Sequence, residues 1–197
     1  MKKIDSLIDS QTKEFVVICH KFIKYLDTLP DKKISDFWVS QMQMLSGIYK
    51  GIFNLPPIET RYEADVEKFV TEKEYNNMRK KLAEFIGPLD KFPDFNDMSH
   101  PGSLKIVEVS LAEMLTDIYQ DLKDFVKLYE TGSLENMNDA IAECYESFGQ
   151  YWGIKLLTSL RIIHVNHYQQ RYAESKKAKQ LDMEIEEIMD DSEYEEE

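Results

Sequence analysis

Apolar residues recur at steps of three and four positions along most of this 197-residue chain. This period is typical of helices that bury one face. Between residues 12 and 29, for example, the pattern runs through Phe15, Ile18, Phe22 and Leu26. The chain holds only 7 glycines and 6 prolines, whereas turn-rich β-architectures need more of both. The sequence therefore predicts an all-α fold, a helical bundle of five or six helices.

Capping residues and prolines divide this pattern into separate helices. The first predicted helix ends at Pro30, and a second begins near Ser35. Thr71 and Ser110 are each followed three residues later by glutamate, which is a capping box. Ser133 begins the last helical region, which extends to about residue 179.

Two stretches interrupt the predicted helices. Residues 88–102 contain Pro88, Pro93 and Pro101 and are predicted to form a long loop. The only candidate strand is a short run at residues 105–109. A second interruption, a break in the last helical region, is expected between Gly149 and Gly153, because each glycine costs helix stability.

The acidic residues are concentrated at the C-terminal end. Residues 182–197 contain ten acids and no base, and without them the formal net charge of −13 falls to −3. We expect residues 1–181 to form a single helical domain and residues 182–197 to be a disordered acidic tail. A domain so close to neutrality has no general attraction to phosphate backbones, so nucleic acid is not an expected partner.

The sequence also bears on the compartment. Cys19 and Cys144 lie in separate apolar patterns and in no ligand-spaced cluster, which favours buried free thiols in a reducing environment. The apolar run at residues 15–19 is too short for a signal peptide, and no run approaches the roughly 18 residues of a membrane span. We therefore expect a cytoplasmic protein with no membrane partner.

Residues 148–165 form the most informative segment, because apolar side chains cover nearly its whole helical circumference. This pattern predicts a helix at the centre of the bundle. A buried Arg161 would then need a carboxylate partner, because an uncompensated buried charge costs several kcal/mol. Asp117 and Asp121 share one face of the helix predicted after Ser110, and we expect one of them to pair with Arg161.

These considerations define one candidate binding cluster on the two central helices. His164 follows Arg161 by one helical turn, and Trp152 lies in the same segment. A structural ion-pair network is the main alternative to a functional site there. The candidate binding residues are Asp117, Asp121, Arg161, His164 and Trp152.

Two further patterns carry little chemical information. Glu143 and Glu146 share a helix face, but the only downstream acidic pair at matching spacing lies in the predicted tail. His164 and His167 have the spacing of a metal-binding pair, yet no second helix repeats it, so His167 is interpreted as a core or edge histidine. No phosphate-binding loop or catalytic triad signature is present. We expect no bound metal or cofactor.

Two segments resemble a known family. Residues 110–123 read SLAEMLTDIYQDLK, residues 148–153 read FGQYWG, and residues 160–164 read LRIIH. They are similar to the "SLADDLADIYRDLK"-like and HWG-containing helices of a bacterial domain of unknown function, family number 5063. The resemblance implies an all-helical fold and no established activity. Tyr151 replaces the family's His and Gln120 replaces an Arg, so a metal or acid–base role of that His cannot operate here.

The absence of a catalytic signature favours a non-catalytic binding or protein-interaction module. Its partner would be an unidentified protein or a small anionic ligand. The alternative is a metal-dependent hydrolase that uses Asp117, Asp121 and neighbouring acids on the same helix.

Overall fold

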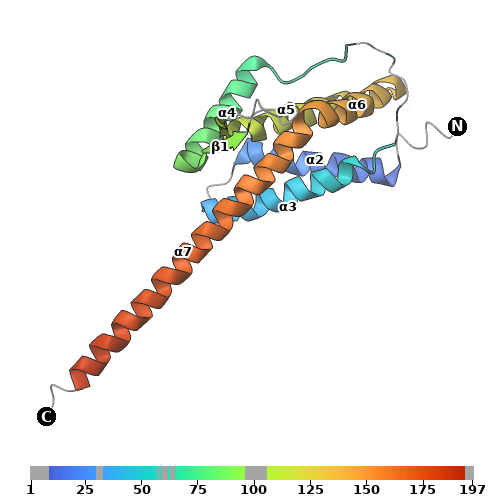
Figure 1. The fold of residues 1–197 in the computed structure, drawn as a ribbon. Coiled ribbons are helices and arrows are strands. Elements are labelled where there is room, and N and C mark those ends of the chain that lie inside the picture. Colours follow the sequence, from blue (N-terminus) through green and yellow to red (C-terminus); the bar gives the residue numbers. More distant parts are fainter. Residues whose placement is uncertain are drawn as a thin grey trace.

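The chain forms a bundle of α-helices in a computed structural model (Figure 1). The model describes residues 9–29, 33–56, 58, 62, 65–95 and 106–193. Its helices are α2 (Ser10–Thr28), α3 (Ile34–Ile52), α4 (Glu72–Ile86), α5 (Leu111–Tyr129), α6 (Leu134–Ser147) and α7 (Gly153–Glu193). The predicted all-α bundle is confirmed.

Helix α5 lies at the centre and packs against α2, α4, α6 and α7. Several sides of this helix are buried. Leu115, Ile118 and Leu122 are fully inaccessible to solvent. Helix α7 packs against α3 and α5 over its first half only. Cys19 and Cys144 are free and buried as predicted, and burial raises the pKa of both thiols.

The predicted N-caps Thr71 and Ser110 are confirmed, whereas Ser35 is not the N-cap of α3, which begins after Lys33 without a side-chain capping hydrogen bond. The side-chain oxygens of Thr71, Ser110 and Ser133 each accept a hydrogen bond from the backbone N–H three residues later. These bonds are 3.2, 3.1 and 3.0 Å long. They satisfy N–H groups that have no partner within the first helical turn, and so fix where α4, α5 and α6 begin.

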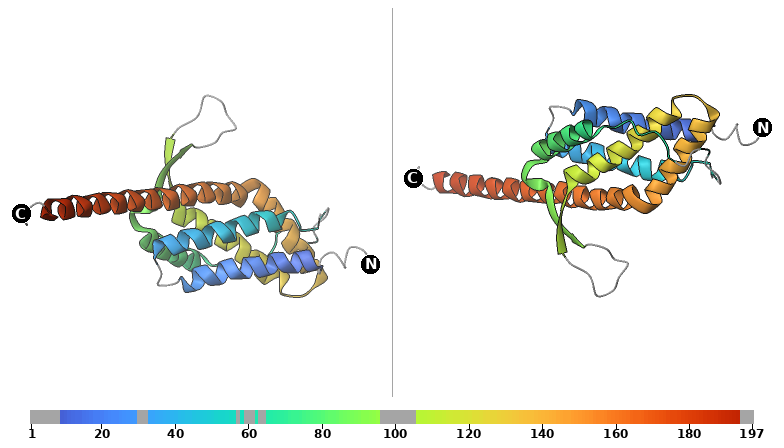
Figure 2. Two further views of the ribbon diagram at one scale, coloured as in Figure 1. Left: turned by 90° about the horizontal axis from the view of Figure 1, so that it is seen from below. Right: turned by 90° about the horizontal axis from the view of Figure 1, so that it is seen from above.

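A β-hairpin occupies part of the region predicted as a long loop. Strand β1 (Lys91–Phe95) pairs antiparallel with β2 (Ile106–Ser110), and Figure 2 shows the hairpin standing out from the bundle beside α7. The loop prediction is wrong for β1, whereas the candidate strand at residues 105–109 corresponds to β2. Pro93 is tolerated because a two-stranded ribbon has open edges, where a missing N–H breaks no ladder. The rest of the predicted loop, 96–102, lies outside the described residues.

The predicted break between α6 and α7 is confirmed as a short π-helix, Phe148–Trp152. Its backbone bond runs from the N–H of Gly153 to the carbonyl oxygen of Phe148. A Cβ atom at Gly153 would lie 2.4 Å from that oxygen, so only glycine fits at this position. The π-turn changes the direction of the chain and sets the line along which α7 leaves the bundle.

The second half of α7 extends well beyond the bundle (Figure 1). Residues 182–197 were predicted to be a disordered acidic tail; the backbone of this segment belongs to α7 as far as Glu193. Residues 194–197 lie outside the described residues. Within the described ranges, no helix has the length and apolar character needed to cross a bilayer.

Candidate functional site

One face of α7 is exposed, contrary to the prediction that its first half is buried all round. Trp152, Leu156 and Ile163 face the core, but Ile154 on the opposite side is 65% exposed. The exposed apolar residues of this face, here called the α7 stripe, are Ile154, Leu157, Val165, Tyr168 and Tyr172 of α7 and Tyr151 of the π-turn directly before it. At 100° per residue they span about one third of the circumference. The prediction failed because a continuous apolar pattern does not reveal which side the neighbouring helices leave open.

Arg161 lies on this exposed face, and its predicted pairing with Asp117 or Asp121 is wrong. Its side chain is 58% exposed, and its Nη2 donates a 2.8 Å hydrogen bond to Oδ1 of Asp94 on β1. The hairpin supplies this carboxylate on the solvent side of α7, so the guanidinium needs no acid from α5.

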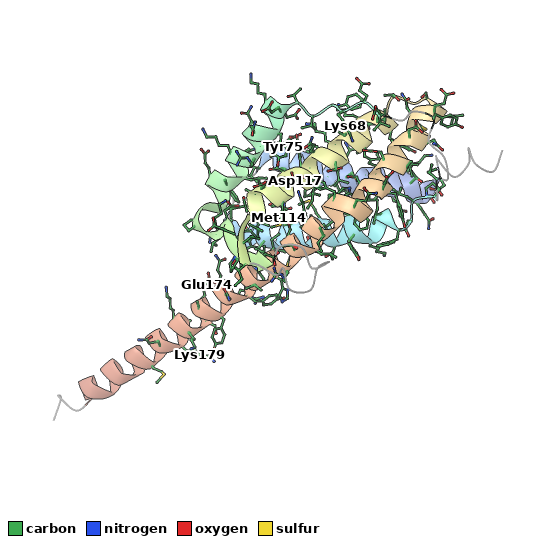
Figure 3. The ribbon with its side chains drawn as sticks, turned by 45° about the horizontal axis from the view of Figure 1, so that its top comes forward. Lys68, Tyr75, Met114, Asp117, Glu174 and Lys179 are labelled. Atoms are coloured by element: carbon green, nitrogen blue, oxygen red, sulfur yellow. The ribbon has the colours of Figure 1, made fainter. Side chains whose placement is uncertain are left out.

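Asp117 is buried on the central helix, and its ion-pair partner is Lys155 rather than Arg161. The Lys155 Nζ atom lies 2.5 Å from Oδ2 of Asp117, and the Tyr75 hydroxyl donates to Oδ1 at 2.7 Å. Asp117 is only 4% exposed, and Figure 3 shows it on α5 between Tyr75 and Met114. Both carboxylate oxygens are therefore occupied within the fold.

The pKa shifts around Asp117 follow from this packing. Burial alone would lower the pKa of Lys155, but its interactions with Asp117 and Tyr151 outweigh burial and raise that pKa. The Lys155 ammonium also lies 3.6 Å from the centre of the Tyr151 ring. Burial, together with the hydrogen bond to Asp117, raises the pKa of Tyr75. Lys155 is thus held as a cation and Tyr75 as a neutral donor at neutral pH.

A groove of about 780 Å³ lies between the hairpin, the start of α5 and the exposed side of α7. Asp117, Lys155 and Arg161 line it, so two of the predicted site residues, Asp117 on α5 and Arg161 on α7, line the same groove although they are not paired. Ile154 belongs both to the groove and to the α7 stripe. The groove and the stripe therefore form one continuous surface.

Asp121 belongs to a different part of the molecule. Its Oδ1 accepts a 2.5 Å hydrogen bond from the Ser147 hydroxyl at the end of α6. One turn further along α5, Asp124 accepts hydrogen bonds from the backbone N–H groups of Phe69 and Val70 at 2.7 and 2.8 Å. These carboxylates tie α6 and the segment before α4 to the central helix, and neither lines the groove.

Replacing Asp121 with asparagine is expected to raise the free energy of unfolding at pH 7 by about 1–2 kcal/mol. Burial raises the pKa of Asp121 from its ordinary 3.8 to about 6, despite the hydrogen bond from Ser147. The folded state therefore binds this proton more tightly than the unfolded state, so the wild-type chain gains stability as the pH falls from about 6 towards 4. Urea unfolding at pH 7 and pH 5 measures both effects.

Wild type should be more stable at pH 5 than at pH 7 in part because Asp121 takes up a proton, and the Asp121→Asn variant should lack that part of the increase. Asp36→Asn, on α3, serves as a control for loss of a negative charge. An Asp121→Asn variant that is less stable than wild type at pH 7 would contradict the account.

The two remaining cluster residues have unrelated roles. His164 is exposed, and its ring lies 4.6 Å from that of Tyr168. Trp152 is fully buried against the Phe148 ring, 4.7 Å away between centroids. His167 is largely buried, as predicted for a core or edge histidine, but its buried Nδ1 has no hydrogen-bond partner among the described residues, whereas a satisfied histidine was expected. Among the described side chains, no three potential ligands of the His, Cys, Asp and Glu types gather to hold a metal ion.

The basic residues of α7 were not among the predicted site residues. Between Gly153 and Leu181 the helix carries six lysines and arginines and a single acid, Glu174. Four of these bases, here called the basic block, are Arg171, Lys176, Lys177 and Lys179. Figure 3 shows Glu174 and Lys179 on the part of α7 that extends beyond the bundle. Counting charge along this one helix, rather than over the whole chain, reveals the block in the sequence.

Comparison with known proteins places this fold in a family without assigning an activity. Residues 6–169 match the sequence model of a protein family, the domain of unknown function DUF5063. The crystal structure of protein BF1032 from Bacteroides fragilis is similar, with a TM-score of 0.70 and 31% sequence identity over 81% of this chain and 93% of that chain. No curated protein matches. The chain therefore belongs to the DUF5063 family, as the motifs on α5 and α7 indicated.

Proposed function

We propose that this protein is a non-catalytic interaction module, and that α7 binds a polypeptide with an acidic, amphipathic segment. The observation that carries the proposal is the exposed α7 stripe and the basic block that follows it on the same helix.

The stripe has the composition of a protein-binding surface. Three of its six residues, Tyr151, Tyr168 and Tyr172, are tyrosines, a residue type enriched among those that dominate binding energy. Large apolar patches are uncommon on monomeric proteins and mark interaction sites when polar groups surround them. Scattered exposed apolar residues need no such explanation, but these six lie on one side of α7 and the π-turn before it, with the exposed Arg161 among them.

The charge of α7 indicates the chemistry of the partner. Lys155 and Arg161 already have partners in Asp117 and Asp94. Within the described part of the chain, the four residues of the basic block form no ion pair, and Lys176 lies 5.1 Å from the centre of the Tyr172 ring. An acidic segment with an apolar face would therefore find both tyrosine rings and unpaired cations.

The carboxylates of α5 support this choice over hydrolysis. Asp117, Asp121 and Asp124 all accept short hydrogen bonds from groups of the protein itself. Such contacts hold α4, α6 and α7 on the central helix and indicate a structural role for these acids.

The test uses a fluorescein-labelled synthetic helix of leucine and glutamate that is unrelated to this chain. Fluorescence anisotropy should show saturable binding to the wild-type protein. The double variant Tyr168→Ser and Tyr172→Ser should weaken it at least tenfold, about 1.4 kcal/mol. Val17→Ser removes an equally exposed apolar side chain on α2 and should leave the affinity unchanged. Absence of binding, or equal loss in the two variants, would rule out the proposal.

A further inference from the structure

The α7 stripe connects two surfaces of opposite charge. Near the start of the helix, Ile154 lines the groove that α7 forms with the hairpin and α5. Further along, Lys176 and Lys179 follow Tyr172 by four and seven residues, so they continue the stripe on the same side of the helix. The stripe therefore runs from the groove to the basic block.

The groove is the negative end of this surface. Its lining carries four acids and three bases, and the ion pairs of Lys155 and Arg161 neutralise two of each. The remaining acids, Glu108 on β2 and Glu113 in the first turn of α5, are exposed and form no ion pair within the described part of the chain. Lys91 is the one remaining base among the lining residues, so the unpaired groups leave a net negative charge.

The basic block is the positive end. Its four bases and Glu174 are all exposed. Figure 3 shows Glu174 and Lys179 on the extension of α7, whereas Met114 and Asp117, which line the groove, lie within the bundle. From Ile154 to Lys179 the helix rises by roughly 38 Å, at 1.5 Å per residue. One helix thus presents opposite charges at two well-separated places.

We infer that the segment bound by α7 is a helix with one cationic end, which lies in the groove, and one acidic end, which lies on the basic block. This inference rests on the proposed function of α7 and specifies the charge order of its partner. A helix laid along the stripe presents its own apolar face at a matching period. A uniformly acidic segment would place carboxylates beside Glu108 and Glu113, and like charges oppose association.

The groove suits a lysine or arginine side chain. Val109, Met114 and Ile154 give part of its lining an apolar character. Lysine and arginine bury their methylene stems along such surface while their charged heads remain free to contact acids. Glu108 and Glu113 supply those acids, and opposite charges at the two ends of the partner would fix its position along α7.

Fluorescence anisotropy with two labelled leucine-based helices of equal length tests the inference. One is bipolar, with lysines in its first turns and glutamates in its last turns, and the other carries glutamate throughout. We expect the wild-type chain to bind the bipolar helix at least tenfold more tightly. The double variant Glu108→Lys and Glu113→Lys should reverse this preference, because the groove becomes cationic. A folding defect would instead weaken the binding of both helices alike.

The matched control is Glu14→Lys with Glu135→Lys, because both acids are exposed and lie on α2 and α6, outside the groove. It should leave the preference unchanged. Carbodiimide cross-linking, which joins an ammonium group to a carboxylate in contact with it, should attach lysines of the bipolar helix to Glu108 or Glu113, as located by mass spectrometry.

Three results would overturn the inference and leave the proposed function standing. They are equal affinity of the wild-type chain for the two helices, an unchanged preference in the groove variant, and cross-links confined to acids outside the groove. Failure of the leucine–glutamate helix to bind would instead remove the proposed function beneath the inference.

Discussion

Replacing Lys155 with methionine is expected to lower the free energy of unfolding by about 3–5 kcal/mol. The substitution keeps the length of the side chain but removes the cation from Asp117, whose side chain is 5% exposed. The carboxylate would then be buried with only the Tyr75 hydroxyl as a partner, and a buried charge without compensation is strongly destabilising. Equilibrium unfolding in urea provides the measurement.

Arg161→Met is the matched control, because it removes a cation from the same helix. Its ion pair with Asp94 is exposed to solvent, so the cost should stay below about 1 kcal/mol. Adding Asp117→Asn to Lys155→Met should recover part of the lost stability, because the orphaned charge is removed. If Arg161→Met were the more damaging change, the assignment of Lys155 as the partner of Asp117 would be wrong.

Trp152→Ala is expected to cost about 3–5 kcal/mol, because it empties a fully buried site. The indole packs on Phe148 where the π-turn joins α6 to α7, so the loss would also loosen the start of α7. Thermal and urea unfolding give the change in stability. Ile154→Ala, two residues along on the exposed face, should change stability by less than about 1 kcal/mol.

Trp152→Ala also distinguishes a role of Trp152 in core packing from a role in ligand binding. Trp152 was a candidate binding residue from the sequence, whereas its burial makes it part of the core. A Trp152→Ala protein that keeps wild-type stability but no longer binds the leucine–glutamate helix would restore the binding role and contradict the structural one.

Local signals account for what the sequence predicted well. The caps at Thr71, Ser110 and Ser133 and the break before Gly153 depend on residues within one helical turn. Such features are encoded over short distances along the chain and need no knowledge of the tertiary fold.

Contacts between distant segments account for what was missed. The partner of Arg161 is Asp94, 67 residues away on a strand that contains proline and therefore resembles a loop in sequence. Lys155 is a charge within an otherwise apolar stretch of sequence, but only the direction in which α7 leaves Gly153 brings it to Asp117 on α5. Tyr151, which departs from the family motif, contacts Lys155 and belongs to the exposed stripe.

Hydrogen exchange along α7 tests the central claim, that this helix is a docking surface for an acidic segment, most directly. Backbone amides would be measured with and without a saturating amount of the leucine–glutamate helix. We predict slower exchange in residues 168–179, where Tyr168, Tyr172 and the basic block lie, and little change in α2 or α4. Unchanged exchange throughout α7, or protection confined to residues around Asp117, would contradict the claim.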